Sequence, residues 1–204
     1  MLKGGTVSAV PPFIALTGGM GAGKSTALAA LERLGAAVIS TDAVVHDLYS
    51  APEVRDAVTA RFGADIAPGG VVDRASLARR IFASTPDRAW LEQLLWPLVR
   101  RQVEAWRARV SLLQPPPRAL VVEIPLLFEA GAEQTYDATV AVVADEQLRA
   151  ERAGSRGHAA LAQRDARQLS QEEKAARSTF VVENNGSIEQ LESELSSILD
   201  ILER

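Results

Sequence analysis

The sequence predicts a protein of the α/β class, in which a parallel sheet is covered by helices on both faces. Short apolar runs alternate along the chain with segments of helical periodicity, and these runs lack the polar alternation of half-exposed strands. Continuous apolar runs are typical of parallel sheets, because both faces of such a sheet are buried. We therefore predict three layers, with ligands bound at the carboxyl ends of the strands.

The first strand, loop and helix are predicted between residues 13 and 35. An apolar run from Phe13 to Thr17 leads into a cluster of glycines. Apolar residues then recur at helical spacing as far as Gly35, namely Ala27, Leu28, Leu31 and Leu34. A second buried strand is predicted at Ala36–Ile39 and another helix from Asp42 through Tyr49, so that two parallel strands are joined by a helix.

The middle of the chain, roughly residues 50–113, is predicted to be helical. One apolar face is formed by residues three or four positions apart: Val99, Val103, Trp106, Val110 and Leu113. Such a stripe is more often part of a core than a cofactor-binding face. Pro97 is predicted to open this helix, because a proline in the first turn costs no hydrogen bond.

Three further strands are predicted in the second half of the chain. Beyond the break at Pro115–Pro117, apolar runs at Ala119–Val122 and Ala138–Val143 have strand length, and Phe180–Val182 is a last short one. A polar, arginine-rich stretch from Asp145 to Lys174 precedes this last strand. The chain closes with an amphipathic helix whose apolar positions are Leu191, Leu195, Ile198 and Leu202. This order indicates an open sheet with a helical insertion after the second strand.

Composition narrows the class of function. The 204 residues carry a formal net charge of −4, which argues against a surface built mainly for nucleic acid. The absence of cysteine excludes disulfides and thiolate zinc sites. No apolar run approaches the roughly 18 residues of a membrane span, and residues 1–12 are expected to be a flexible extension rather than a signal peptide. We expect a cytoplasmic protein without nucleic-acid or membrane partners, as a monomer or a weak homo-oligomer.

A phosphate-binding motif lies between the first predicted strand and helix. The segment from Gly18 to Ser25 fits G-x-x-x-x-G-K-[ST] and is in the strand–loop–helix context that the motif requires. Lys24 would reach the β- and γ-phosphates of a nucleotide, and the Ser25 hydroxyl would help to hold Mg²⁺. A flexible glycine turn is the alternative, but a chance match that needs lysine is rare in a chain with three lysines among 22 basic residues. The predicted binding residues are Gly19, Met20, Gly21, Ala22, Gly23, Lys24, Ser25 and Thr26.

Asp42 is the candidate catalytic acid–base residue. It follows the second predicted strand, so its carboxylate is expected at the same edge of the sheet as the glycine loop. A kinase that acts on a hydroxyl needs a group that orients this hydroxyl and accepts its proton. The alternative is that Asp42 is the N-cap of a helix that begins at Ala43.

Other polar residues have weaker assignments. Glu123 and Glu129 flank the turn after the third strand, where either could reach Mg²⁺ through water or anchor the loop. His46 and His158 are too far apart in sequence to indicate a metal centre. Five arginines are dense enough for a cationic lid over a triphosphate, although a solvated helix face is the alternative for most of them: Arg149, Arg152, Arg156, Arg164 and Arg167.

Over residues 13–204 the sequence resembles the dephospho-CoA kinase family. The resemblance lies in an ordered set of segments: Ala15–Thr26, Asp42 with Leu48-Tyr49, Arg80-Ile81-Phe82, Leu94-Leu95, Pro97-Leu98, Pro125–Glu129, Gln147, Arg149, Arg152, Arg156-Gly157, Gln168 and Asn184–Ser187. The phosphate loop alone indicates only a nucleotide, whereas this order of segments is specific.

The resemblance implies transfer of the ATP γ-phosphate to the ribose 3′-hydroxyl of dephospho-CoA, with Mg²⁺, which is the last step of coenzyme A biosynthesis. It makes Asp42 the residue at the acceptor hydroxyl and Arg156 a lid arginine near the phosphates. It also places Asn184 and its turn on the adenine side of the ATP site. The implied fold is a P-loop kinase core at 13–49, 114–144 and 179–204, with a substrate-covering helical insertion at about 50–113 and a lid at about 145–170.

Five positions depart from the family pattern. The family often has aspartate in place of Ser40 and Glu123, histidine in place of Trp96, and Ala-Asp in place of Ser178-Thr179. The phosphate loop and Asp42 are intact.

Two other functions remain open at this point. A different small P-loop kinase, acting on a nucleoside monophosphate or another metabolite, shares the core motif. A nucleotide-dependent switch belongs to another class, but the Asn-Lys-x-Asp signature of guanine-specific switches is absent.

Overall fold

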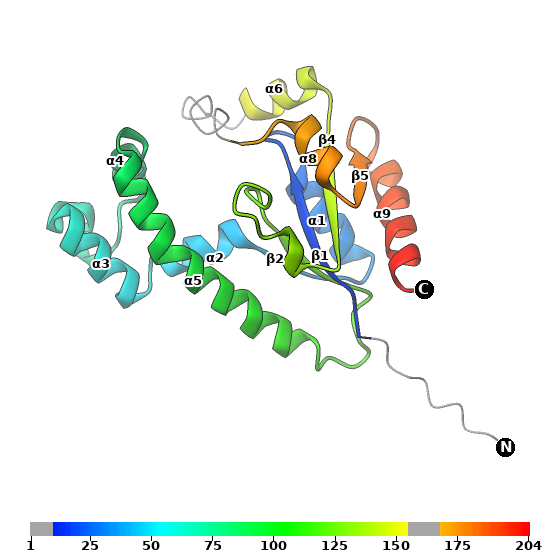
Figure 1. Ribbon diagram of the computed structural model, residues 1–204, viewed down its shortest axis with the longest axis horizontal. Helices are drawn as coiled ribbons and strands as arrows, with labels where there is room; N and C mark the ends of the chain where they lie inside the picture. The colour runs from blue at the N-terminus through cyan, green and yellow to red at the C-terminus, as the bar shows by residue number, and fades with distance from the viewer. Residues whose placement is uncertain (1–9, 155–167) are drawn as a thin grey trace. The chain divides into compact units, whose positions relative to one another are not determined.

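The computed structural model describes residues 10–154 and 168–204 and divides them into two compact units (Figure 1). The first unit comprises residues 10–39, 107–154 and 168–204, and the second comprises Ser40–Trp106. Residues 1–9 of the predicted extension and residues 155–167 of the predicted lid lie outside the described ranges.

The first unit is built on a five-stranded sheet with the order β2-β3-β1-β4-β5. Strand β1 pairs in parallel with β3 and β4, and β4 pairs in parallel with β5. Each strand lies within one residue of its predicted position: β1 Phe13–Gly18, β2 Ala37–Ser40, β3 Leu120–Glu123, β4 Ala138–Val143 and β5 Phe180–Glu183. The predicted parallel α/β fold is confirmed.

Helices and loops cover both faces of this sheet. Alternate residues of a strand point to opposite faces, and in β1 Ile14 and Leu16 join the core beneath α1 (Lys24–Arg33) and α9 (Ile188–Leu202). Ala15 points the other way and packs against Leu127 and Phe128. Helix α8 (Gln171–Arg177) contacts β1 and β4, α6 (Glu146–Gly154) follows β4, and a short 3-10 turn, η3, is at Glu133–Thr135.

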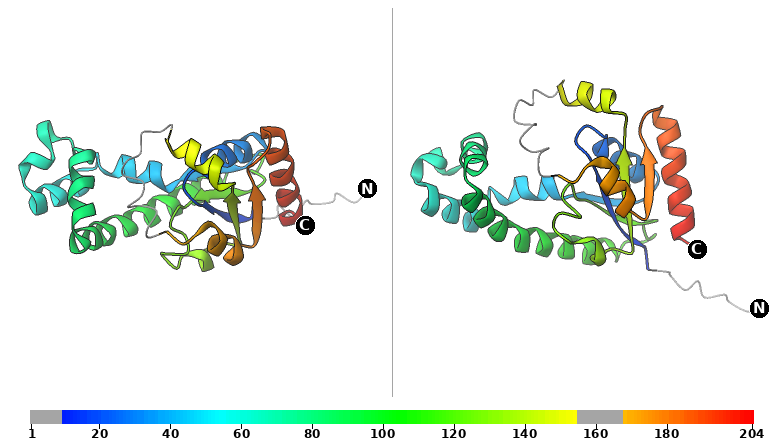
Figure 2. Two further views of the ribbon diagram at one scale, coloured as in Figure 1. Left: turned by 90° about the horizontal axis from the view of Figure 1, so that it is seen from above. Right: turned by 45° about the horizontal axis from the view of Figure 1, so that its top comes forward.

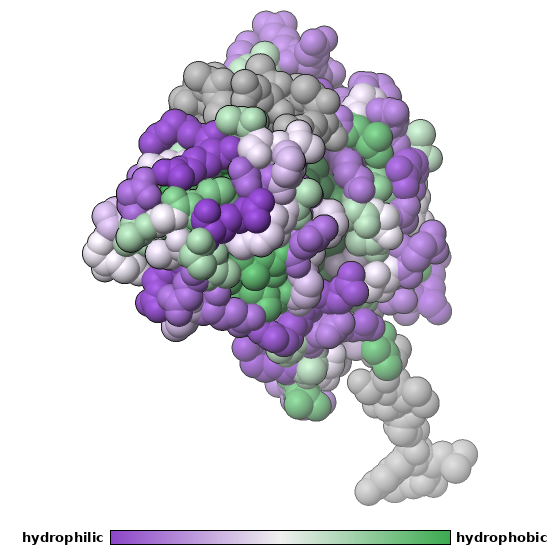
Figure 3. All heavy atoms as spheres, turned by 60° about the vertical axis from the view of Figure 1, so that its left-hand side comes forward, coloured by the Kyte–Doolittle hydropathy of each residue, from purple (hydrophilic) through white to green (hydrophobic). Residues whose placement is uncertain are grey.

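The second unit is helical. It contains α2 (Thr41–Leu48), α3 (Pro52–Phe62), two 3-10 turns, η1 (Ala64–Ile66) and η2 (Pro68–Gly70), α4 (Arg74–Ala83) and most of α5 (Thr85–Val110). Helix α4 begins after Asp73, whose carboxylate accepts hydrogen bonds from the backbone N–H groups of Ala75 and Ser76. On the face shown in Figure 3, hydrophilic side chains surround a patch of hydrophobic ones.

Helix α5 corrects two predictions about the middle segment. Pro97 lies inside this helix and does not open it, although a proline there removes one helical hydrogen bond. The buried leucines on either side, Leu95 and Leu98, outweigh this local cost. Leu113 is beyond the end of α5 and 49% exposed. Among the other predicted stripe residues, Val103, Trp106 and Val110 are buried, and Val99 is half-buried.

No helix among the described residues has the length and apolar character needed to cross a membrane.

Candidate active site

The phosphate-loop motif forms a tight loop between β1 and α1, both in the first unit. Gly21 and Gly23 have φ values of 74° and 92°, a left-handed conformation that is costly for residues with a side chain. Contacts also require glycine at position 23, because a Cβ there would lie 1.9 Å from Nδ2 of Asn184. The loop can therefore turn its backbone closely around a ligand.

The N-terminus of α1 lacks a side-chain cap. Its N-cap residue is Gly23, and its first turn contains no acidic residue. Helices α8 and α9 differ, because Ser170 with Glu173 and Ser187 with Gln190 form complete capping boxes. The first N–H groups of α1 and its positive dipole end are thus suited to an anion such as a nucleotide phosphate.

Lys24 is the first residue of α1 and is turned back onto the loop. Its Nζ donates hydrogen bonds to the carbonyl oxygens of Gly18 and Gly19, at 3.0 Å each. Ser25 follows and is exposed. The side chain of Lys24 therefore lies against the loop in which it is predicted to bind phosphate.

Asn184 connects the loop to β5. Its side chain is buried and donates from Nδ2 to the carbonyl oxygen of Ala22 at 2.9 Å, while its backbone N–H donates to the carbonyl of Val143 at 2.8 Å. Both Nη atoms of Arg152 donate to the Asn184 carbonyl, at 3.1 and 3.2 Å. The structure thus gives Asn184 a supporting position against the phosphate loop.

Arg149 of α6 also contacts the loop. Its Nε donates to the carbonyl oxygen of Met20 at 2.9 Å, and its guanidinium lies over Gly19. Helix α6 is at the same end of the sheet as the loop between β1 and α1 (Figure 2). Two of the five candidate arginines, Arg149 and Arg152, are therefore at the site. The other three, Arg156, Arg164 and Arg167, lie outside the described residues.

A cavity of about 490 Å³ lies beside α6, at the carboxyl ends of β4 and β5. Arg149, Gln171 and Asn185 line it together with four acidic residues: Asp145, Glu146, Glu172 and Glu183. Asn185 is held by Asp145, because the Asp145 N–H donates to Oδ1 of Asn185 at 2.8 Å and Nδ2 of Asn185 donates to Oδ1 of Asp145 at 3.0 Å. This lining disfavours phosphate and suits an uncharged group that donates hydrogen bonds.

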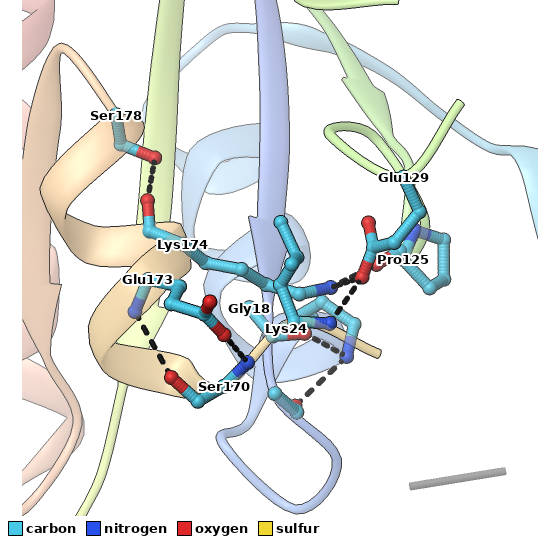
Figure 4. Close-up of polar contacts among 10 residues, drawn as sticks. Gly18, Lys24, Pro125, Glu129, Ser170, Glu173, Lys174 and Ser178 are labelled. Atoms are coloured by element: carbon cyan, nitrogen blue, oxygen red, sulfur yellow. Dashed lines mark hydrogen bonds and ion pairs between the residues drawn. The ribbon is translucent and has the colours of Figure 1, made fainter. Parts of the chain in front are cut away.

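Glu129 anchors the loop after β3, one of the two roles predicted for it. Figure 4 shows the buried Lys174 of α8, whose Nζ lies 3.0 Å from Oε1 of Glu129 and donates to the carbonyl oxygen of Pro125 at 2.5 Å. The N–H of Leu169 also donates to Oε1 of Glu129, at 2.9 Å. Sequence reasoning missed Lys174, although the scarcity of lysine that strengthened the assignment of Lys24 applies equally to it.

Glu123 is at the end of β3, and the register places it beside Leu16 of β1. Its side chain is buried. Glu123 and Ser25 are oxygen donors in the unit that holds the phosphate loop, and such donors suit Mg²⁺, which takes one or two protein ligands besides phosphates and water. Within the described ranges no group of three histidine or acidic side chains could hold a metal ion by itself.

Asp42 is the second residue of α2, in the second unit, and is exposed. The N-cap of this helix is Ser40, so the alternative prediction that Asp42 caps a helix from Ala43 is wrong. The helix begins earlier than expected because β2 leads directly into it at Thr41.

Comparison with known proteins identifies relatives along almost the whole chain. The family model described as dephospho-CoA kinase matches residues 12–190. The dephospho-CoA kinase of Deinococcus radiodurans is 40% identical over 196 residues, which cover 95% of this chain and 93% of that protein. That of Rhizobium meliloti is 37% identical over 193 residues, or 93% of this chain and 97% of that protein. The crystal structure of TT1252 from Thermus thermophilus is 35% identical and superposes with a TM-score of 0.76 over 95% of this chain and 99% of that one.

Proposed function

This chain belongs to the dephospho-CoA kinase family, and we propose that it transfers the γ-phosphate of ATP to the ribose 3′-hydroxyl of dephospho-CoA, giving CoA and ADP. The observation that carries the proposal is the glycine loop that ends at the uncapped N-terminus of α1. The dephospho-CoA kinase relatives of this chain support it. A kinase for nucleoside monophosphates shares the loop, but the comparisons do not favour it.

Lys24 would bind the β- and γ-phosphates once ATP enters the loop. Its Nζ would leave the neutral Gly18 and Gly19 carbonyls and bind phosphate oxygens instead, which share a net negative charge. In-line transfer moves charge onto the bridging oxygen of ADP, and a fixed cation nearby stabilises that charge. The backbone N–H groups at the start of α1 would act in the same way.

Asp42 would orient the acceptor hydroxyl and accept its proton. The bond from the 3′-oxygen to the γ-phosphorus then forms as the bond from this phosphorus to the β–γ bridging oxygen breaks, and ADP leaves. An exposed carboxylate in the first turn of α2 suits this role because its oxygens are open to an incoming hydroxyl. Ser25 and Glu123 would hold Mg²⁺, which neutralises phosphate charge when bound.

The adenine base of ATP would lie in the cavity lined by Asn185 and Arg149. Its exocyclic amino group is a hydrogen-bond donor that matches an acidic lining. Arg156 remains our proposed lid arginine, and Asn184 would contribute by holding the loop. We expect the protein to act in the cytoplasm, as a monomer or a weak homo-oligomer.

The proposal is tested by an acceptor screen with ATP and Mg²⁺. We expect equimolar ADP and CoA with dephospho-CoA and little ADP with AMP or other nucleoside monophosphates. Rapid phosphorylation of a nucleoside monophosphate would support the other kinase class. ADP release that does not depend on any acceptor would reject both.

A further inference from the structure

One exposed face of α2 carries Asp42 and, four residues later, His46. Residues four apart on a helix lie on the same side, with Cβ atoms about 5–6 Å apart. The imidazole of His46 is in turn contacted through Nδ1 by Nη1 of Arg74, the first residue of α4. Asp42, His46 and Arg74 all belong to the second unit.

The contact between Arg74 and His46 leaves the positive charge of the arginine uncompensated. A guanidinium can only donate hydrogen bonds, so Nδ1 of His46 accepts, and the imidazole in this contact is neutral with its proton on Nε2. The carboxylate of the neighbouring Asp73 is occupied at the start of α4, where it accepts from the Ala75 and Ser76 N–H groups.

Five other arginines of this unit differ, because each of them is paired with a carboxylate. The pairs are Arg55 with Asp56, Arg61 with Asp87, Arg80 with Asp65, Arg88 with Glu92 and Arg101 with Glu53. Arg74 is therefore a cation that is positioned by a neutral ring and still able to bind an anion.

We propose that Arg74 and His46 bind the diphosphate of dephospho-CoA. This inference rests on the proposed function, in which Asp42 contacts the 3′-hydroxyl. The 3′-hydroxyl and the 5′-diphosphate are attached to the same ribose, so a group that binds the diphosphate lies about one sugar ring from the group at the hydroxyl. One turn of α2 separates Asp42 from His46 by a similar length.

The two side chains supply complementary donors. The planar guanidinium of Arg74 can give two parallel hydrogen bonds to phosphate oxygens, and Nε2–H of His46 can give a third. Because the diphosphate does not change during the reaction, this contact would be equal in the ground state and the transition state. It should therefore act on KM for dephospho-CoA rather than on kcat.

The test compares Arg74→Ala with Arg79→Ala, a matched control on the same helix that removes the same charge. We expect Arg74→Ala to raise KM for dephospho-CoA about 10- to 100-fold, the effect of losing a charged hydrogen bond. KM for ATP and kcat should stay within about twofold. Arg74→Lys should recover part of the loss, and His46→Ala should raise KM less than Arg74→Ala.

Three outcomes would overturn the subsite: an unchanged KM for dephospho-CoA in Arg74→Ala, an equal rise in KM for both substrates, or an equal effect of Arg79→Ala. Calorimetric binding of dephospho-CoA to each variant separates this inference from the proposed function. If the wild type binds dephospho-CoA but does not phosphorylate it, the proposed function fails, and the affinity of Arg74→Ala still decides the subsite. Arg74→Lys serves the same comparison if Arg74→Ala does not fold.

Discussion

Lys174 donates to two acceptors of one loop, Oε1 of Glu129 at 3.0 Å and the carbonyl oxygen of Pro125, although its side chain is completely buried. The loop follows β3 and is joined to β1 by the hydrogen bond from the Ile124 N–H to the Leu16 carbonyl at 2.8 Å. One buried ammonium group thus fixes the loop at the carboxyl end of β3 to helix α8. Such a group is costly to bury unless it is paired.

Replacing Lys174 with methionine should destabilise the protein strongly. The change leaves the largely buried carboxylate of Glu129 without its cation, and breaking a buried pair on one side costs about 3–5 kcal/mol. Urea unfolding should show this loss, and the double variant Lys174→Met/Glu129→Leu should lose less. Arg33→Ala, which breaks the exposed pair with Glu192, should cost about 1 kcal/mol or less. Equal losses in the two single variants would contradict the assigned role.

Lys24→Met should abolish most of the activity while leaving the fold intact. The side chain contacts the carbonyls of Gly18 and Gly19, which can bind water instead. Without the cation, phosphoryl transfer should fall by at least about 100-fold. Single-turnover kinetics and a melting curve measure the two effects, and wild-type turnover in the folded variant would rule out the phosphate-loop assignment.

Asp42→Asn should separate binding from chemistry. The variant keeps the size of the side chain but cannot accept the hydroxyl proton, so kcat should fall about 10²- to 10⁴-fold, while the Kd for ATP stays unchanged. Asp47→Asn, an exposed change on the same helix, is the control and should keep its kcat. Near-normal phosphorylation of dephospho-CoA by Asp42→Asn would refute the catalytic role.

Acid should weaken the start of α4. Hydrogen bonds from the side chain and then the backbone of Ser76 hold the pKa of Asp73 below its ordinary value of 3.8. A lowered folded pKa contributes stability that is complete above the unfolded value and is lost as the pH falls through the folded one. The Tm difference between wild type and Asp73→Ala should therefore be constant above about pH 5 and shrink below 3.8. Asp73→Asn is the control, because asparagine keeps the cap but does not titrate. A Tm difference between wild type and Asp73→Ala that does not change with pH would contradict the assignment.

Local patterns predicted most of the fold and the centre of the site. The strands are short apolar runs bounded by glycine, proline or polar residues, and in β4 the predicted and observed bounds are the same, Ala138–Val143. The phosphate loop is contiguous in sequence, so the motif includes both the residues and their spacing. Such features do not depend on distant partners, and this is why sequence alone could predict them.

The remaining features depend on tertiary contacts. Glu129 and Lys174 meet across 45 residues (174 − 129), and no periodicity marks such a pair. Nothing in the sequence distinguishes Arg149 from the other four candidate arginines. The fold does, because it places Arg149 against Met20, 129 residues away. The prediction for Pro97 failed for a different reason. A proline is a strong local signal for the start of a helix, but packing of the buried leucines around Pro97 stabilises a helix that continues through it.

The scarcity of lysine has a consequence for protein chemistry. The described residues include two lysines, Lys24 and Lys174, and the second is inaccessible to solvent. An amine-reactive acylating reagent that labels this part of the folded chain therefore reports on the phosphate loop. Protection of that single position by added ATP would give a direct footprint of nucleotide occupancy, without any engineered label.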